Sequence, residues 1–254
     1  MGDFITRFYE SGWLGELIGD MHHPGGERLI EEIGKRCAID ETSHVLDIGC
    51  GNGVTTLEIA SSFGCTIRGL DISPTLIDEA REKADRYGSV KCVFQLTNGE
   101  IPFFLNDTYD AVLFISSLSL FESKLDGLRE ARRILKPEGT LYISNIVVSE
   151  RLLSQDSSRM MFASCIAGAL PMDSMATLIE NAGFKEVVTI DWSHELRRQW
   201  ATAFMRIQLR KGSKGSPLRR LDVPERDELK EFFRRAEELF DSGALGYCLF
   251  IGKK

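Results

Sequence analysis

The chain has 254 residues, and its apolar content of 43% is sufficient for the core of one large domain or of one domain with a cap. Its formal net charge of −7 argues against a broad nucleic-acid-binding surface, which would need a basic face. The six cysteines include no C-x-x-C pair, so we expect a reducing, cytoplasmic environment and no metal site. No apolar run approaches the length of a membrane span, so we expect no membrane partner.

The first 40 residues precede the first predicted strand and carry aromatic residues, including Tyr9, at mixed helical spacing. Such a segment fits a helix that packs on the core. His22 and His23 then introduce a Pro-Gly-Gly turn that leads into a helix over about Glu27–Cys37. Adjacent histidines point in different directions, so these two make a poor metal-binding pair.

A short apolar strand, Ser43–Ile48, runs into a loop with glycine at positions 49, 51 and 53, and a helix over Val54–Phe63 follows. Glycine permits positive φ and leaves no Cβ in the way, so a small molecule can approach the N–H groups at the helix N-terminus. A dinucleotide site is one interpretation. Its G-x-G-x-x-G pattern, however, needs a third glycine where this chain has Val54.

A carboxylate, Asp71, stands at the end of the next predicted strand, Cys65–Leu70. Its two oxygens match the two hydroxyl donors of a ribose. A helix N-cap is the alternative role, but Ser73 and Pro74 already supply the cap and first-turn signals of the helix that follows. Asp71 therefore indicates a cofactor that contains a nucleoside, but it does not show which nucleoside cofactor binds.

Strands and helices continue to alternate, which predicts an α/β fold with a doubly wound, mostly parallel sheet and helices on both faces. The later predicted strands are Val90–Leu96, Tyr109–Ile115, Leu141–Val147, Phe184–Asp191 and Gly246–Gly252. The later predicted helices are Thr75–Tyr87, Lys124–Leu135, Leu152–Leu170, Asp173–Ala182, Glu195–Leu209 and Glu225–Asp241. Lys136–Thr140 is predicted as a helix-ending turn, and 210–220 as a basic loop.

Several segments together resemble class I S-adenosylmethionine-dependent methyltransferases. They are Asp47-x-Gly49-x-Gly51-x-Gly53, the run 97–103 that ends in Ile-Pro-Phe, Tyr109-Asp110-x-Val112, and Leu135-Lys136-Pro137-x-Gly139. The resemblance implies a seven-stranded Rossmann-like sheet whose last strand is antiparallel. Thr97 departs from the family pattern, which usually has aspartate there, and this leaves the adenine contact less defined.

The resemblance implies S-adenosylmethionine as the cofactor, with roles assigned by position. Asp47 would hold the ammonium group, the glycine loop the methionine part, Asp71 the ribose, and the residues after the third strand the adenine. The implied cofactor-binding residues are Asp47, Gly49, Cys50, Gly51, Gly53, Asp71, Ile72, Asn98, Gly99 and Ser116.

The chain organisation expected on this basis has four parts. They are an N-terminal helical lid (1–40), a cofactor-binding core (41–194), a helical insertion (195–243) and the last strand of the core (244–254). Family members usually join the last two strands by a short turn, so we expect the insertion to be a cap or a homodimer contact.

The implied reaction is in-line methyl transfer to a small-molecule acceptor, with no nucleic-acid partner. A hydroxyl acceptor would need a base, and His23 is the first candidate for a base or polar contact, followed by His194. Tyr9, Ser117 and Cys165 are candidates for the acceptor pocket.

Other functions stay open at this stage. His-Pro-Gly-Gly and the segment after Cys165 resemble arsenite-methyltransferase-like small-molecule enzymes, but no second cysteine is convincingly placed for arsenic chemistry. An NAD-dependent oxidoreductase and a non-catalytic interaction module with this fold are the remaining alternatives.

Overall fold

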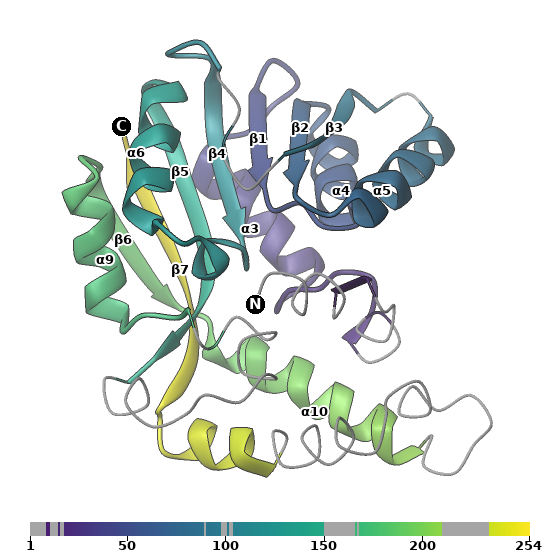
Figure 1. The fold of residues 1–254 in the computed structure, drawn as a ribbon, viewed down its shortest axis with the longest axis vertical. Helices are drawn as coiled ribbons and strands as arrows, with labels where there is room; N and C mark the ends of the chain where they lie inside the picture. Colours follow the sequence, from purple (N-terminus) through teal and green to yellow (C-terminus); the bar gives the residue numbers. More distant parts are fainter. Residues whose placement is uncertain are drawn as a thin grey trace.

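A computed structural model of the chain contains a seven-stranded sheet with helices on both faces (Figure 1). The structure describes residues 9–10, 15, 18–88, 90–97, 101, 104–149, 166, 168–209 and 234–254. The strands are β1 (His44–Ile48), β2 (Thr66–Asp71), β3 (Cys92–Leu96), β4 (Tyr109–Ile115), β5 (Leu135–Val148), β6 (Lys185–Asp191) and β7 (Leu245–Lys253). The helices are α3 (Glu27–Cys37), α4 (Val54–Phe63), α5 (Pro74–Tyr87), η1 (Leu118–Leu120), α6 (Lys124–Ile134), α9 (Met172–Asn181) and α10 (Ser193–Leu209).

The strands lie in the order β3-β2-β1-β4-β5-β7-β6. β1 pairs in parallel with β2 and β4, while β7 runs antiparallel between β5 and β6. The predicted doubly wound α/β fold and its antiparallel last strand are therefore confirmed. The strand order reverses beside β1, because β2 lies on one side of it and β4 on the other, and such a switch point leaves a crevice at the carboxyl ends of the strands.

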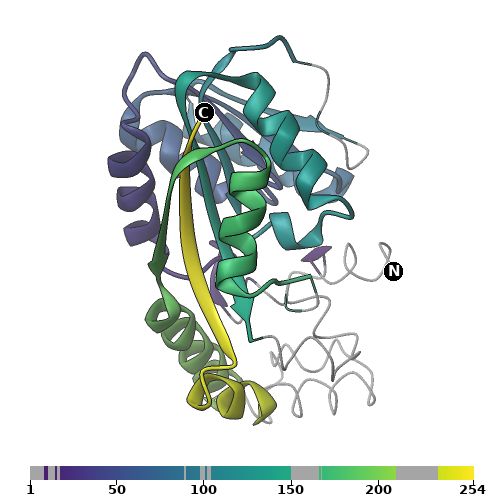
Figure 2. The same cartoon turned by 90° about the vertical axis from the view of Figure 1, so that its left-hand side faces the viewer.

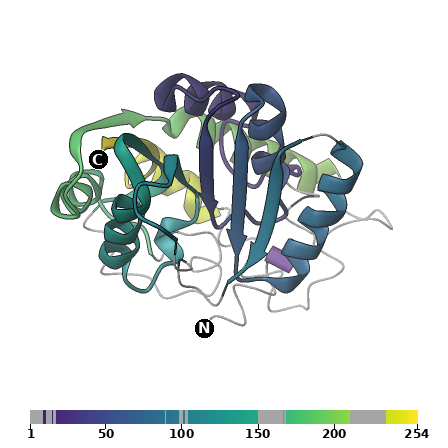
Figure 3. The same ribbon diagram turned by 90° about the horizontal axis from the view of Figure 1, so that it is seen from above.

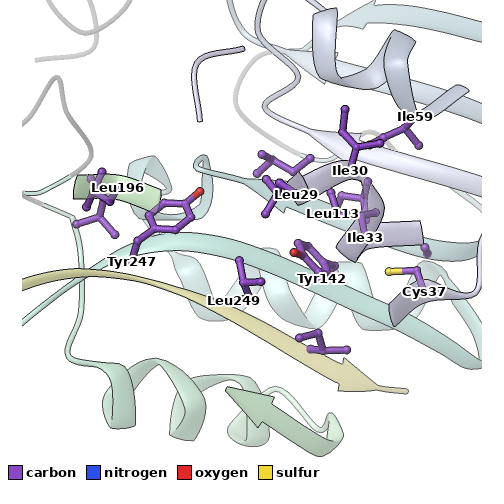
Figure 4. Packing of buried hydrophobic residues seen from close by; sticks show 14 of the residues in the cluster. Leu29, Ile30, Ile33, Cys37, Ile59, Leu113, Tyr142, Leu196, Tyr247 and Leu249 are labelled. Atoms are coloured by element: carbon purple, nitrogen blue, oxygen red, sulfur yellow. The ribbon is translucent and has the colours of Figure 1, made fainter. Parts of the chain in front are cut away.

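Two hydrophobic clusters bury the two faces of the sheet. The cluster on one face includes Leu29 of α3, Ile59 of α4 and Leu196 of α10. The cluster on the other face includes Leu128 of α6 and Ile179 of α9. Figures 2 and 3 show these helix layers on opposite sides of the sheet. Figure 4 shows part of the first cluster, in which α3 packs against the sheet near β5 and β7.

One predicted turn belongs to a strand instead. The sequence separates Lys136–Thr140 from the strand that follows, but β5 already begins at Leu135, which pairs with Tyr109. The pairing then shifts register, so that Thr140 lies opposite Ala111. Pro137 ends the helix as expected, because its ring and missing N–H disfavour helical backbone. The backbone leaves the ladder as a bulge and rejoins it, rather than forming a separate turn.

The segment between β6 and β7 is described only in part. α10 begins at Ser193, directly after β6, and residues 234–241 form a second helix. The predicted basic loop at 210–220 lies outside the described residues, as does most of the predicted helix Leu152–Leu170. Within the described ranges, no helix combines the length and the apolar character that a membrane span requires.

Candidate functional site

A cavity of about 470 Å³ opens at the carboxyl ends of β1, β2 and β4, where the strand order reverses. This is the expected ligand position in an open α/β sheet. Its lining comes from the N-terminal segment, the glycine loop, the end of β2 and the turn after β4. The lining residues are Tyr9, His22, His23, Asp47, Ile48, Gly49, Cys50, Gly51, Asn52, Thr55, Leu70, Asp71, Ile72, Ser73, Leu76, Thr97, Ile115, Ser116, Ser117, Leu120, Phe121 and Glu122.

The three loop glycines have positive φ, at 80° for Gly49, 54° for Gly51 and 75° for Gly53. They serve different purposes. A Cβ on Gly49 would lie 2.4 Å from Ser117 Cβ, and one on Gly53 would lie 2.6 Å from Ala80 Cβ, so these two allow close packing. A Cβ on Gly51 would meet nothing within 4 Å. Gly51 therefore leaves space beside a backbone that faces the cavity.

Asp47 is a carboxylate with one oxygen left without a partner. The residue is 1% exposed, and its Oδ2 accepts a hydrogen bond of 2.6 Å from Thr56 Oγ1. Its Oδ1 is buried and accepts no hydrogen bond from any residue that the structure describes. Burial raises the pKa of Asp47 to about 7, opposed by the Thr56 bond and assisted by the charge of Asp71. A buried, unpaired acceptor of this kind is costly unless a donor is bound there.

Asp71 stands at the end of β2 with both oxygens engaged by backbone donors. Gly51 N donates to Oδ2 at 2.8 Å, and Ser73 N donates to Oδ1 at 2.9 Å. Burial raises the pKa of Asp71, and these N–H bonds oppose the increase. Each oxygen keeps a second lone pair, so the carboxylate can still accept two hydroxyl donors from a ligand. The Ser73 hydroxyl donates to Glu10 Oε1 at 2.6 Å and accepts from Leu76 N, which confirms Ser73 as the cap of α5.

The turn after β4 forms the opposite wall of the cavity. Ser116 has a φ of 54°, a conformation that residues with a Cβ seldom adopt. Its backbone N donates to Ser144 O at 2.8 Å, and its Oγ lies 2.6 Å from Tyr247 Oη. The Ser117 hydroxyl donates to the carbonyl of Ile48. The turn is thus anchored to β1, β5 and β7.

Both histidines of the His-His-Pro-Gly-Gly turn line the cavity. His23 is 4% exposed, with Nε2 at 2.8 Å from Thr55 Oγ1 and Nδ1 at 3.3 Å from the carbonyl of Pro24. Burial lowers the pKa of both His22 and His23 to about 4, so both rings are neutral near pH 7. His194 lies elsewhere, because its largely exposed side chain contacts Glu195 at the start of α10.

Most of the residues that the sequence singled out meet in this cavity. Those that line it are Tyr9, His23, Asp47, Gly49, Cys50, Gly51, Asp71, Ile72, Ser116 and Ser117. Gly53 stands behind the loop as the N-cap residue of α4. Asn98, Gly99 and Cys165 lie outside the described residues. Within the described part of the chain, no group of three or more His, Cys, Asp or Glu residues could hold a metal ion.

Other residues of the cavity wall were not predicted from the sequence. Leu120, Phe121 and Glu122 line the cavity from η1 and the turn after it, and Tyr247 lies behind Ser116. The short η1 has too few residues for a periodic signal. Tyr247 is 131 positions from Ser116, so no local pattern connects the two.

Comparison with known proteins identifies the family. The family model described as "Methyltransferase domain" matches residues 39–208. The chain belongs to the class I S-adenosylmethionine-dependent methyltransferases. Methyltransferase GfsG of Streptomyces halstedii is 27% identical to it over 199 residues, which are 76% of this chain and 71% of that protein. The 27-O-demethylrifamycin SV methyltransferase of Amycolatopsis mediterranei (strain S699) is 24% identical over 232 residues, covering 89% and 83% of the two chains.

Solved structures agree with this fold. Phosphoethanolamine N-methyltransferase 2 of Haemonchus contortus, in complex with S-adenosyl-L-methionine, superimposes with a TM-score of 0.79 at 18% identity. The match covers 98% of this methyltransferase but only 57% of the Haemonchus chain. At that identity the likeness concerns the fold alone.

The cavity of this methyltransferase fits the family cofactor on its own geometry. The unpaired Oδ1 of Asp47 can accept a hydrogen bond from an ammonium group. Asp71, held by two backbone N–H groups, can accept the two hydroxyls of a ribose. Both carboxylates would also favour a cationic ligand, since opposite charges attract strongly where water is excluded.

Proposed function

We propose that this methyltransferase transfers the methyl group of S-adenosylmethionine to a small-molecule acceptor by in-line displacement. The observation that carries the proposal is the buried, unpaired Oδ1 of Asp47, which lies in the same cavity as the backbone-held carboxylate of Asp71. An ammonium group and a ribose are present together in this cofactor, and its sulfonium supplies an already activated methyl donor.

The protein would contribute by aligning the acceptor with the methyl group, rather than by activating the methyl donor. Asp47 at β1 would hold the ammonium group of the cofactor and Asp71 at β2 its ribose, while the cavity continues to the turn after β4. The wall there combines Ser116 with the largely apolar pair Leu120 and Phe121. An acceptor placed against this wall would lie beside the cofactor in a fixed orientation, which is how proximity accelerates a displacement.

The size and lining of the cavity support a small acceptor. A volume of about 470 Å³ is in the range of small-molecule sites, and the cofactor would take a share of it. The relatives include a protein named for the O-methylation of a rifamycin, a small molecule. We infer a small acceptor rather than nucleic acid. A cytoplasmic location and a homodimer stay predictions.

His23 is proposed as a polar contact of the acceptor side rather than as its base. Its two ring nitrogens already lie near Thr55 and Pro24, and a pKa of about 4 makes the ring a poor acceptor for a hydroxyl proton. Tyr9 and Ser117 are proposed to border the acceptor, with Cys165 proposed beside them from the sequence alone.

Calorimetry with S-adenosylhomocysteine and with NAD⁺ tests the proposal. We expect saturable binding of S-adenosylhomocysteine and none of NAD⁺. The same protein, incubated with methyl-labelled S-adenosylmethionine and a panel of phenols and alcohols, should label at least one of them. Tight NAD⁺ binding would favour an oxidoreductase. Binding of neither compound would favour a non-catalytic module.

A further inference from the structure

We propose that the methyl acceptor carries a protonated amine and that Glu122 binds this amine. Glu122 would then select the acceptor by its charge, whichever atom of the acceptor receives the methyl group. The inference rests on the proposed function, because it assumes that the cofactor occupies Asp47 and Asp71 and that the acceptor lies against the wall after β4.

Glu122 lies on the acceptor side of the cavity. It lines the cavity together with Leu120 and Phe121, in the turn that follows η1. Asp47 and Asp71 also line the cavity, but they belong to β1 and β2. Under the proposed function, the ammonium group and the ribose of the cofactor occupy these two acids. Among the described lining residues, Glu122 is then the carboxylate that stays available to an acceptor.

The residue before Glu122 is held from several directions. The ring of Phe121 makes an edge-to-face contact with Phe114, with the ring centroids 5.5 Å apart. Its backbone N donates to Leu118 O at 3.1 Å, and its carbonyl accepts from Lys124 Nζ at 3.1 Å. Close packing and hydrogen bonds of this kind restrict both the ring and the backbone. Glu122 therefore starts from a fixed point on the cavity wall.

The residue after Glu122 is fixed as well. Ser123 Oγ accepts a hydrogen bond from Asp126 N and caps α6, and Ser123 O accepts from Gly127 N at 3.2 Å. A backbone anchored on both sides does not have to become ordered when a ligand binds, which lowers the entropic cost of binding. The turn thus presents the Glu122 side chain to the cavity in advance of the ligand.

The carboxylate of Glu122 is open to a ligand. No residue in the described part of the chain forms an ion pair or a hydrogen bond with it. Lys124 is the cation nearest to it in sequence, and its amine is directed at the carbonyl of Phe121 instead. Both oxygens of the carboxylate can therefore accept hydrogen bonds from a bound molecule.

The chemistry of this wall gives the class of acceptor. An ionised carboxylate accepts hydrogen bonds and donates none, and its bonds to a charged donor are stronger than those to a neutral one. Leu120 and Phe121 provide apolar surface beside Glu122, and an aromatic face also attracts a cation. An amine attached to an apolar body matches both features. An acceptor with a carboxylate or a phosphate would meet a like charge at the same wall.

The chain contains a matched control for Glu122. Glu138 is also exposed, but it lies in the bulge near the beginning of β5, whereas the cavity opens at the carboxyl ends of the strands. Glu122→Gln and Glu138→Gln therefore remove the same charge and keep the same side-chain shape. Only the first of the two variants changes the cavity wall.

The experiment uses the full chain saturated with S-adenosylhomocysteine, so that the cofactor site is filled. Three probes share one apolar body: 2-naphthylmethylamine, 2-naphthalenemethanol and 2-naphthoate. In calorimetry, wild type should bind the amine about fivefold or more tightly than the alcohol, as expected for a charge-assisted hydrogen bond at a partly exposed site, and 2-naphthoate most weakly. Glu122→Gln should bring the ratio of amine to alcohol affinity close to one, and Glu138→Gln should leave it unchanged. Affinity for S-adenosylhomocysteine should be equal in all three proteins.

The outcomes separate the two proposals. If wild type does not bind S-adenosylhomocysteine, the proposed function fails and the inference fails with it. If it binds that compound but shows no preference for the amine, or binds none of the three probes, the inference is overturned and the proposed function stands. A preference that persists in Glu122→Gln, or that falls equally in Glu138→Gln, would also overturn the role of Glu122.

Discussion

At the residue scale, two carboxylates dominate the cavity, and burial disfavours the charged form of both. Burial raises the pKa of both Asp47 and Asp71, and the side-chain and backbone groups that contact them are neutral donors. Such sites are costly in the empty protein and are expected where a ligand compensates the cost. Asp47, whose pKa is raised to about 7, therefore couples ligand affinity to pH near neutrality.

Asp47→Asn should lower the affinity for S-adenosylhomocysteine at pH 8 by tenfold or more, because the amide keeps the shape and removes the charge that faces the ammonium group. The matched control is Asp110→Asn, which removes an equal charge from a carboxylate paired with Lys136 outside the cavity. Calorimetry on the two variants and wild type provides the measurement. Equal affinities for all three would contradict the role of Asp47.

The pKa of about 7 for Asp47 predicts a pH dependence with a definite sign. The folded empty protein keeps the Asp47 proton up to about pH 7, whereas the unfolded chain loses it near the ordinary value of 3.8. Its contribution to the free energy of unfolding therefore falls as pH rises from about 4 to about 7. Ligand affinity should rise over pH 6–8, since only the carboxylate pairs with an ammonium group. In Asp47→Asn this rise should vanish, as titration calorimetry at several pH values would reveal.

Asp71→Ala should cost about 1.5–3 kcal/mol of cofactor affinity, the range for hydrogen bonds to a charged group. Calorimetry with S-adenosylhomocysteine measures the change, and circular dichroism checks that the variant is folded. An unchanged affinity would remove the ribose assignment. The variant also removes the acceptor of Gly51 N and Ser73 N. The measured loss of affinity is therefore an upper limit for the contribution of the ribose contact itself.

At the element scale, the first turns of the helices frame the cavity. Gly53 ends the loop as the N-cap of α4, and Ser73 caps α5 through its bond to Leu76 N. Ser73 has a further contact, because its hydroxyl donates to Glu10 of the N-terminal segment. The start of α5 thus connects Asp71, which accepts from Ser73 N, to Glu10 in the segment that precedes the sheet.

Ser73→Ala should lower the free energy of unfolding by about 1 kcal/mol, the usual cost of losing a serine cap. Ser123→Ala is the control, since Ser123 caps α6 in the same way and does not line the cavity. Both variants should lose similar stability in urea denaturation. Only Ser73→Ala should also bind S-adenosylhomocysteine more weakly, and an equal affinity in the two variants would show that the Glu10 contact does not bear on the ligand.

At the scale of the whole molecule, a buried carboxylate joins α10, the helix after β6, to α3 near the N-terminus. Glu195 of α10 is 5% exposed and pairs with Arg28 of α3 at 2.9 Å and with Arg198 at 3.2 Å. Arg28 follows the Pro-Gly-Gly turn, and its N–H bonds to Gly25 O. The start of α10 is therefore held against α3.

Glu195→Gln should lower the free energy of unfolding by about 1 kcal/mol, because the buried charge is lost while both arginines remain in contact with water. The loss should shrink in 1 M salt, since screening weakens the partly exposed pairs. Glu82→Gln offers a comparison, as its pair with Arg86 is exposed on both sides and should cost less than about 0.5 kcal/mol. Equal losses for the two variants in urea denaturation would contradict a joining role for Glu195.

The sequence alone determined the sheet, the glycine loop and the positions of Asp47 and Asp71. These features are local, because strand periodicity, glycine backbone freedom and a carboxylate at a strand end are each written within a few residues. A parallel sheet then brings the carboxyl ends of its strands to one edge, so the two acids meet without further information. The bulge in β5 escaped this reasoning, since it depends on the pairing of Leu135 with a neighbouring strand.

Only the tertiary structure decided which polar atoms are left unpaired and which distant residues come into contact. The free Oδ1 of Asp47 follows from burial and from Thr56 satisfying only one oxygen. The contact between Ser116 and Tyr247 joins positions 131 residues apart, because the antiparallel strand β7 comes from the C-terminal end of the chain. Hydrogen bonding and burial depend on distances between distant segments, and those distances exist only once the chain has packed.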